Sequence, residues 1–102
     1  MNDTERIISN QTFQWDSEKA ALNWQKHKVD FEDAALVFAD ENRIERYDNE
    51  HSDDEERYIT IGKVDKILFV IYTERGETIR LISARRATVQ ERRDYYAGNE
   101  GY

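Results

Sequence analysis

Three consecutive segments with β-type patterning, between residues 57 and 84, constrain the fold of this chain more than any other feature. Residues 57–64 alternate polar and apolar side chains, residues 66–73 are almost continuously apolar as a central strand is, and residues 78–84 follow. The junctions between them are short, and the second contains Gly76. Because closely spaced strands pair with their sequence neighbours, we expect an antiparallel β-meander.

A short strand and two helices are expected before the meander. Residues 12–15 alternate as a strand does, and Asp16 is a suitable N-cap for a helix over residues 17–27. Asp30 can cap a second helix, in which apolar residues recur at helical spacing. These residues are Phe31, Ala34, Ala35 and Phe38.

A fourth strand and a third helix complete the expected fold. Residues 43–47 contain β-branched and aromatic side chains and indicate the fourth strand. Thr88 and Glu91 have the spacing of a capping box, and Gly98 is a suitable stop for the helix that they begin. The order of elements predicts an α+β domain with an N-terminal strand and two helices, a meander of about four antiparallel strands with the helices against one face, and a C-terminal helix.

Length and composition limit the class of protein. A chain of 102 residues is one ordinary domain, which excludes a multidomain enzyme, and the lack of cysteine excludes a disulfide framework, a thiolate zinc site and a cysteine nucleophile. The longest apolar run, residues 67–72, is too short to cross a bilayer. We expect a cytoplasmic protein with a flexible lead-in over residues 1–11, one domain over 12–97 and a loose tail over 98–102.

Charge is distributed unevenly along the chain. The net charge is −7, but residues 1–56 hold 16 acidic and 6 basic residues, whereas residues 57–102 hold 6 acidic and 9 basic ones. The second half therefore permits a basic face on an acidic protein, although surface arginines that pair with the many acids remain the simpler interpretation. Its arginines are Arg57, Arg75, Arg80, Arg85, Arg86, Arg92 and Arg93.

Residues 48–56 form a polar loop that contains seven titratable side chains. The EF-hand pattern fails there, because its glycine and glutamate positions, counted from Asp48, hold Asp53 and Ile59. A solvated loop is therefore favoured over a cation site. His51 lies in this loop, and imidazole can transfer a proton near neutral pH, but a surface histidine is the simpler interpretation.

Arg80 needs an explanation because it occupies the interior of a predicted strand and is expected to share a face with Ile82 and Ala84. It lies either on the solvated face of a half-covered sheet or in a concave site for an anion. If the start of the strand that contains Arg57 aligns with the end of the strand that contains Arg80, then Arg57, Arg85 and Arg86 meet at one rim of the sheet.

Three stretches together resemble the BrnT family of bacterial type II toxins. They are FQWDSEKAALNWQKHKVDFEDAALVF, HSDDEERYITIG and IRLISARRATVQERRDYY, which cover most of the chain in the same order and spacing. The sequence departs from the family pattern at Lys28, where glycine is common, and at Glu41, where proline is common. The resemblance implies a RelE-like fold, a ribonuclease that needs no metal or cofactor, a BrnA-like antitoxin as partner, and contact with operator DNA only through that antitoxin.

The resemblance implies RNA cleavage, and the residue types fit attack of the 2′-hydroxyl on the adjacent phosphorus, which requires a proton acceptor, a proton donor and cations around the phosphorane. We assign His51 as the leading acid or base, with Glu55 or Glu56 as its partner. The cations around the phosphate would be Arg57, Arg80 and Arg85. Secondary candidates for substrate binding are Lys26, His27, Arg75 and Arg86.

Two other classes of function stay open. An inactive member of the family would act only as a co-repressor or binding module with its antitoxin, and intact RNA after incubation would favour this. An acidic interaction or metal-sensing domain would use the loop at residues 48–56 instead, and calorimetry with divalent cations would reveal it.

Overall fold

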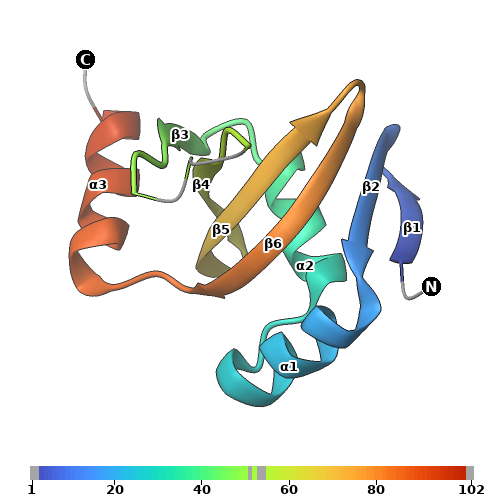
Figure 1. Ribbon diagram of the computed structural model, residues 1–102. Coiled ribbons are helices and arrows are strands. Elements are labelled where there is room, and N and C mark those ends of the chain that lie inside the picture. Colours follow the sequence, from blue (N-terminus) through green and yellow to red (C-terminus); the bar gives the residue numbers. More distant parts are fainter. Residues whose placement is uncertain (1–2, 51, 53–54, 101–102) are drawn as a thin grey trace.

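A computed structural model describes residues 3–50, 52 and 55–100. The strands form one six-stranded sheet in the order β1-β2-β6-β5-β4-β3 (Figure 1). The chain order is β1 (Asp3–Ile8), β2 (Gln11–Asp16), α1 (Ser17–His27), α2 (Phe31–Leu36), the 3-10 turn η1 (Val37–Ala39), β3 (Ile44–Tyr47), β4 (Tyr58–Val64), β5 (Lys66–Arg75), β6 (Thr78–Arg86) and α3 (Val89–Glu100). The predicted α+β class is confirmed.

The predicted meander is β3 to β6, whose neighbours all pair antiparallel. Asp65 makes the turn between β4 and β5 with a φ of 62°, and Gly76 makes the next with the same value. A positive φ costs glycine little, so its place at the second turn agrees with the sequence pattern. Gly62 in β4 is needed for close packing and not for a turn, since an added Cβ would lie 2.7 Å from Cγ1 of Val37.

The N-terminus differs from the prediction of a flexible lead-in over residues 1–11. Residues 3–8 form β1, which pairs antiparallel with β2 through a tight turn at Ser9 and Asn10, both with positive φ. Sequence patterning missed this strand because it lies at the sheet edge and its side chains are mostly exposed. β2 then pairs parallel with β6, so the sheet is mixed and not wholly antiparallel.

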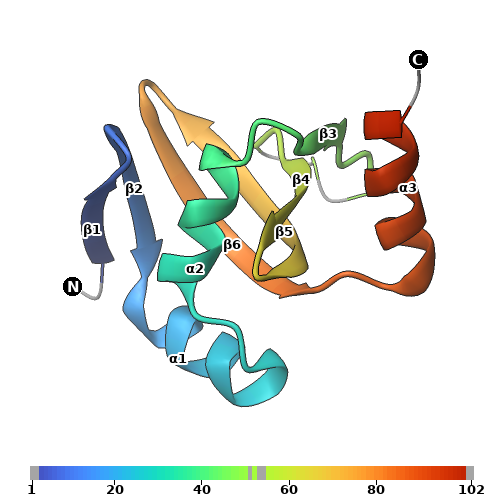
Figure 2. The same ribbon diagram turned by 180° about the vertical axis from the view of Figure 1, so that it is seen from behind.

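Helices α1 and α2 cover one face of the sheet (Figure 2). As predicted, Asp16 accepts hydrogen bonds from the backbone at the start of α1, and Asp30 does so at the start of α2. The core on this face joins both helices to β2, β5 and β6. Its largest members are Phe13, Trp15, Phe31, Leu68, Tyr72 and Leu81.

Helix α3 packs on the opposite face, which corrects the expectation that all helices share one face. Its Tyr95 is buried with Ile61 and Ile67, whereas Leu68 and Val70 of β5 belong to the other core. Because successive side chains of β5 point to opposite faces of the sheet, this strand contributes apolar residues to both cores. The helix also continues through Gly98 to residue 100, so residues 98–100 are not a loose tail; Gly98 instead allows close packing, since a Cβ there would lie 3.2 Å from Ile44.

Asp40 fastens α3 to the sheet. One of its oxygens accepts from the hydroxyl of Tyr95 at 2.7 Å and from the backbone N–H of Lys63 at 2.8 Å, and the other from the N–H of Asn42 at 2.9 Å. Burial alone would raise the pKa of Asp40, but these hydrogen bonds hold it below its ordinary value. Burial, followed by the bond to Asp40, raises the pKa of Tyr95 to about 12, so the hydroxyl keeps its proton.

Acid is expected to remove the contribution of Asp40 to stability. A folded pKa below the unfolded one means that this contribution is complete above the unfolded pKa and is lost as pH falls through the folded pKa. The destabilisation caused by Asp40→Asn should thus be about 2 kcal/mol near pH 7 and shrink between about pH 5 and pH 2. Urea unfolding across this pH range measures it, with Glu41→Gln as the control; a pH-independent difference would contradict the assignment.

Candidate active site

Arg80 and Arg85 lie on the same face of β6 because a β-bulge interrupts the strand. The register between β5 and β6 shifts next to Tyr72, so that Ile82 is an extra residue in β6. Leu81 and Ala84 on either side of the bulge both join the core with α1 and α2. The two arginines therefore face away from that core, and the expectation that Arg80 shares a face with Ala84 is wrong.

Arg57 lies on this face as well, because Tyr58 beside it packs against the core with α1 and α2 while Ile59 packs on the other side. β4 and β6 are both antiparallel to β5 and run parallel to each other, so their starts lie at the same end of the sheet. Arg57 is consequently near Arg80 and far from Arg85 and Arg86. The hypothesis of a single rim with Arg57, Arg85 and Arg86 is wrong for this reason.

A cluster of four charged side chains forms at that end: Glu55, Arg57, Arg75 and Arg80. Nε of Arg75 donates to Oε2 of Glu55 at 3.0 Å, and Nη2 donates to Oε1 at 3.3 Å. This pair lowers the pKa of Glu55 below its ordinary value, and the positive charges of Arg57 and Arg80 lower it further. Glu55 is therefore ionised at neutral pH and can accept a proton. We call these four residues the Glu55 cluster.

Arg57 has unused hydrogen-bonding capacity. Its Nε is enclosed, and no partner for it exists among the residues that the structure describes. The backbone around it is fixed, because the hydroxyl of Ser52 accepts from the N–H of Arg57 at 2.9 Å and the N–H of Asp48 donates to the carbonyl of Arg57 at 2.9 Å. Because Nε itself is enclosed, an incoming anion would meet the half-buried guanidinium of Arg57 at its other nitrogens.

Arg80 is held in place by the first two strands. Its Nη1 donates to Oε1 of Gln14 at 2.8 Å and its Nη2 to Oδ1 of Asp3 at 3.2 Å, and the side chain is only 17% exposed. The parallel pairing of Gln14 with Arg80 places the amide beside the guanidinium. Sequence analysis missed Asp3 because β1 was not predicted, and it missed Gln14 because the pairing of β2 with β6 has no signal in local sequence.

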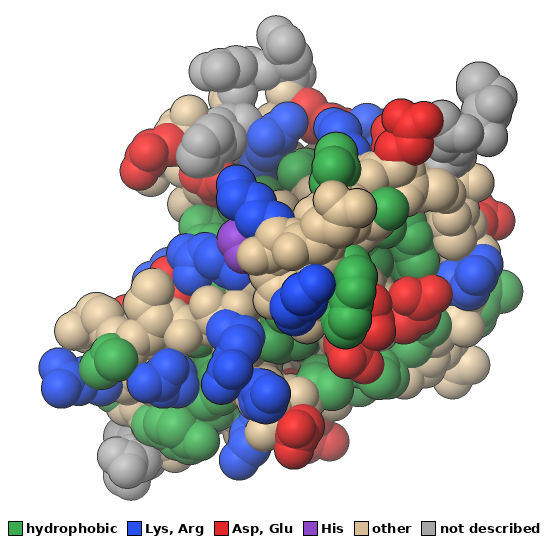
Figure 3. Space-filling model, turned by 90° about the horizontal axis from the view of Figure 1, so that it is seen from below, with side chains coloured by type: hydrophobic (Ala, Val, Ile, Leu, Met, Phe, Trp, Pro, Cys, Tyr) green, Lys and Arg blue, Asp and Glu red, His purple; other side chains and the backbone are tan. Residues whose placement is uncertain are grey.

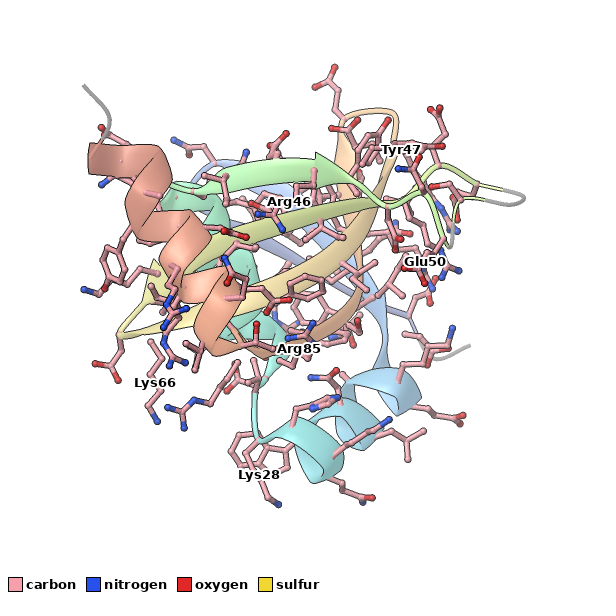
Figure 4. All side chains as sticks on the ribbon, turned by 90° about the vertical axis from the view of Figure 1, so that its left-hand side faces the viewer. Lys28, Arg46, Tyr47, Glu50, Lys66 and Arg85 are labelled. Atoms are coloured by element: carbon pink, nitrogen blue, oxygen red, sulfur yellow. The ribbon has the colours of Figure 1, made fainter. Side chains whose placement is uncertain are left out.

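Arg85 is tied to α3, separately from the Glu55 cluster. It donates to both oxygens of Glu91, at 2.9 and 3.0 Å, and its guanidinium carbon lies 3.9 Å from the centre of the Phe69 ring (Figure 4). Burial would raise the pKa of Glu91, but hydrogen bonds from Arg85 and from the Thr88 backbone lower it. With the bulge, β6 carries Arg85 about 13 Å beyond Arg80. Because Arg80 is held by Gln14 and Asp3 and Arg85 is held by Glu91, the two guanidinium groups occupy separate positions on this face.

Glu56 lines the same hollow as Glu55, where it accepts from the hydroxyl of Tyr58 at 3.4 Å, and its charge raises the pKa of Tyr58. The other predicted site residues lie apart. Lys26 and His27 are in the last turn of α1, and Arg86 is at the far end of β6. His51 lies outside the described residues. Its loop holds no group of three or more metal-ligating side chains in the part that the structure describes.

The fold and the site define a class of protein: a small α+β protein with an arginine-rich sheet face suited to a phosphate-bearing ligand. The sequence matches the family model for the ribonuclease toxin BrnT of type II toxin–antitoxin systems over residues 15–91. The chain therefore belongs to the BrnT family of ribonuclease toxins, and the predicted resemblance is confirmed.

A solved structure agrees with this assignment. The crystal structure of the Brucella abortus ribonuclease toxin BrnT is similar with a TM-score of 0.54 and 25% sequence identity, over 72% of this chain and 92% of that chain. No curated protein sequence gives a significant match. In the described part of the chain, no helix has the length and apolar character needed to span a membrane.

Proposed function

We propose that this chain is a metal-independent endoribonuclease that cleaves RNA, inhibits translation and arrests growth until a cognate BrnA-like antitoxin neutralises it. The observation that carries the proposal is the Glu55 cluster, where an ionised carboxylate lies among three arginines on the sheet face opposite α1 and α2. A carboxylate can accept the 2′-hydroxyl proton, and arginines can stabilise the charge that develops on the phosphorane.

Each charged group takes a separate role in this mechanism. Arg57 binds the phosphate that is cleaved through its guanidinium group, and Arg80 supports it from β6, which β5 separates from β4. Glu55 is favoured over Glu56 as the carboxylate, because Glu55 pairs with Arg75 and feels the charges of Arg57 and Arg80, whereas Glu56 accepts from the hydroxyl of Tyr58. His51, which the sequence analysis assigned as the leading acid or base, then takes the role of proton donor to the leaving oxygen. Arg85 contacts a neighbouring phosphate along the strand instead of the scissile one.

The antitoxin supplies the contact with operator DNA, and the toxin itself is the part that meets RNA. This assignment follows the family, which pairs each toxin with an antitoxin in a type II system.

Expression with and without the neighbouring antitoxin gene tests the function. The chain alone should arrest bacterial growth with loss of intact RNA, and coexpression should restore both. Purified protein should cleave RNA equally in chelator and in magnesium, and calorimetry should show no required cation. Intact RNA with antitoxin-free protein would identify a co-repressor that has lost activity, and cleavage that stops in chelator would contradict the metal-free mechanism.

A further inference from the structure

A second basic region lies at the other end of β6 from the Glu55 cluster. Two hollows of about 230 and 340 Å³ adjoin there, and both are lined by Asp65, Lys66 and Arg86. The first also touches Lys28 of the α1 C-cap, and the second touches Tyr96 of α3. Figure 3 shows lysine and arginine side chains gathered on this side of the molecule, and Figure 4 shows Lys28 and Lys66 projecting from it. We call this region the basic end.

Among the described residues, no carboxylate forms an ion pair with a cation of the basic end. Arginines elsewhere form ion pairs, as Arg75 does with Glu55 and Arg85 with Glu91, but no ion pair involves the basic end among the described residues. Asp33 and Asp65 also line the hollows, so five cations face two carboxylates. An unneutralised cluster in a protein of net charge −7 indicates an anionic ligand. Its members are Lys28, Lys63, Lys66, Arg86 and Arg92.

Exposed aromatic side chains accompany these cations. Nζ of Lys28 lies 5.5 Å from the centre of the Trp24 ring, and the Trp24 side chain is 48% exposed. Tyr96 lines the second hollow and is 47% exposed. Proteins commonly recognise single-stranded RNA with cationic side chains that bind its phosphates and with nearby aromatic rings that stack on its bases. An acidic protein segment would need the cations but not the exposed rings.

We propose that the basic end binds the single-stranded RNA that flanks the cleavage point and holds long substrates on the enzyme. This inference rests on the proposed function. β6 connects the two regions, since Arg80 and Arg86 lie at its opposite ends, about 17 Å apart by the rise of a bulged strand. Arg85 lies between Arg80 and Arg86 along β6. An RNA strand cleaved at the Glu55 cluster therefore reaches the basic end only when it extends beyond a dinucleotide.

The test uses Lys63→Gln/Lys66→Gln in the full chain, because both side chains are exposed at the ends of β4 and β5. Binding of an RNA of about 20 nucleotides should weaken about tenfold, and the slope of log affinity against log salt should become shallower by about 1.4. Cleavage of a dinucleotide should be unchanged. The matched control is Arg6→Gln/Lys19→Gln, which removes the same charge from residues that line neither hollow.

Several outcomes would overturn the inference. Unchanged RNA affinity and salt slope would do so, and weaker antitoxin binding with unchanged RNA binding would make the basic end a protein-docking surface. Lost dinucleotide cleavage with an unchanged melting temperature would place these lysines at the cleavage point itself. If wild-type protein cleaves no RNA but its binding still depends on the two lysines, the proposed function fails while the RNA-binding surface stands.

Discussion

Replacing Arg57 with alanine is expected to lower the rate of RNA cleavage about 100-fold or more without lowering thermal stability by more than a few degrees. Activity can fall without a large loss of stability because Nε of Arg57 has no hydrogen-bond partner in the described part of the structure. Removing the side chain breaks no stabilising bond that the structure shows, and Glu55 keeps its pair with Arg75. What disappears is a positioned donor for the charge of the phosphorane.

Single-turnover cleavage and thermal melting of the same preparations measure this prediction. Arg46→Ala is the matched control, since Arg46 lies on β3 on the face covered by α3 but is already neutralised by Asp94 at 2.7 Å. His51→Ala should lower the rate by a similar factor if the imidazole is the proton donor. Full activity in Arg57→Ala would remove the arginine from the mechanism, whereas loss of activity together with loss of folding would make its role structural.

Local patterning predicted those parts of the fold that depend on neighbouring residues. The alternation and short junctions of residues 57–84 require a meander in almost any context, and Asp16 and Asp30 cap the helices that they precede. The N-terminal strand was not predictable, because its stability comes from pairing with β2 and not from a buried face of its own. The bulge in β6 also has no signal in the local sequence, and it changes the face of the sheet to which Arg85 points.

The sequence supplies the residue types of the candidate site but not their geometry. It permitted a basic face in the second half of the chain and favoured arginines that pair with acids, and Arg75, Arg80 and Arg85 do form ion pairs. Thr88 and Glu91 were recognised as a capping box, which the structure has. The same Glu91 also holds Arg85, a contact that joins a strand to a helix and has no signal in local sequence. Contacts between side chains that are distant in the sequence can be identified only from a three-dimensional structure.

Asn23 is a further residue that local patterning did not identify, and its substitution is expected to destabilise the protein most among polar changes. Its side chain is 7% exposed on α1. Nδ2 donates to the carbonyls of Val29 and Ala84 at 2.9 and 2.8 Å, and Oδ1 accepts from the N–H of Ala84 at 3.1 Å. β2 pairs with β6 only at Ile79 and Arg80. The Asn23 amide therefore makes the hydrogen bonds to the backbone of Ala84 that a neighbouring strand would otherwise make.

Asn23→Ala leaves one buried N–H and two buried carbonyls without their partner, so the free energy of unfolding should fall by about 3 kcal/mol. For a domain of this size, the melting temperature should fall by about 10 to 20 °C. The amide of Ala84 should also exchange with solvent faster, which separates loss of this contact from general loosening. Gln25→Ala on the same helix is the control, since an exposed change should stay within about 0.5 kcal/mol. Slow exchange at Ala84 in the variant would mean that another group closes this edge of the sheet, and the strand-replacing role of Asn23 would then be wrong.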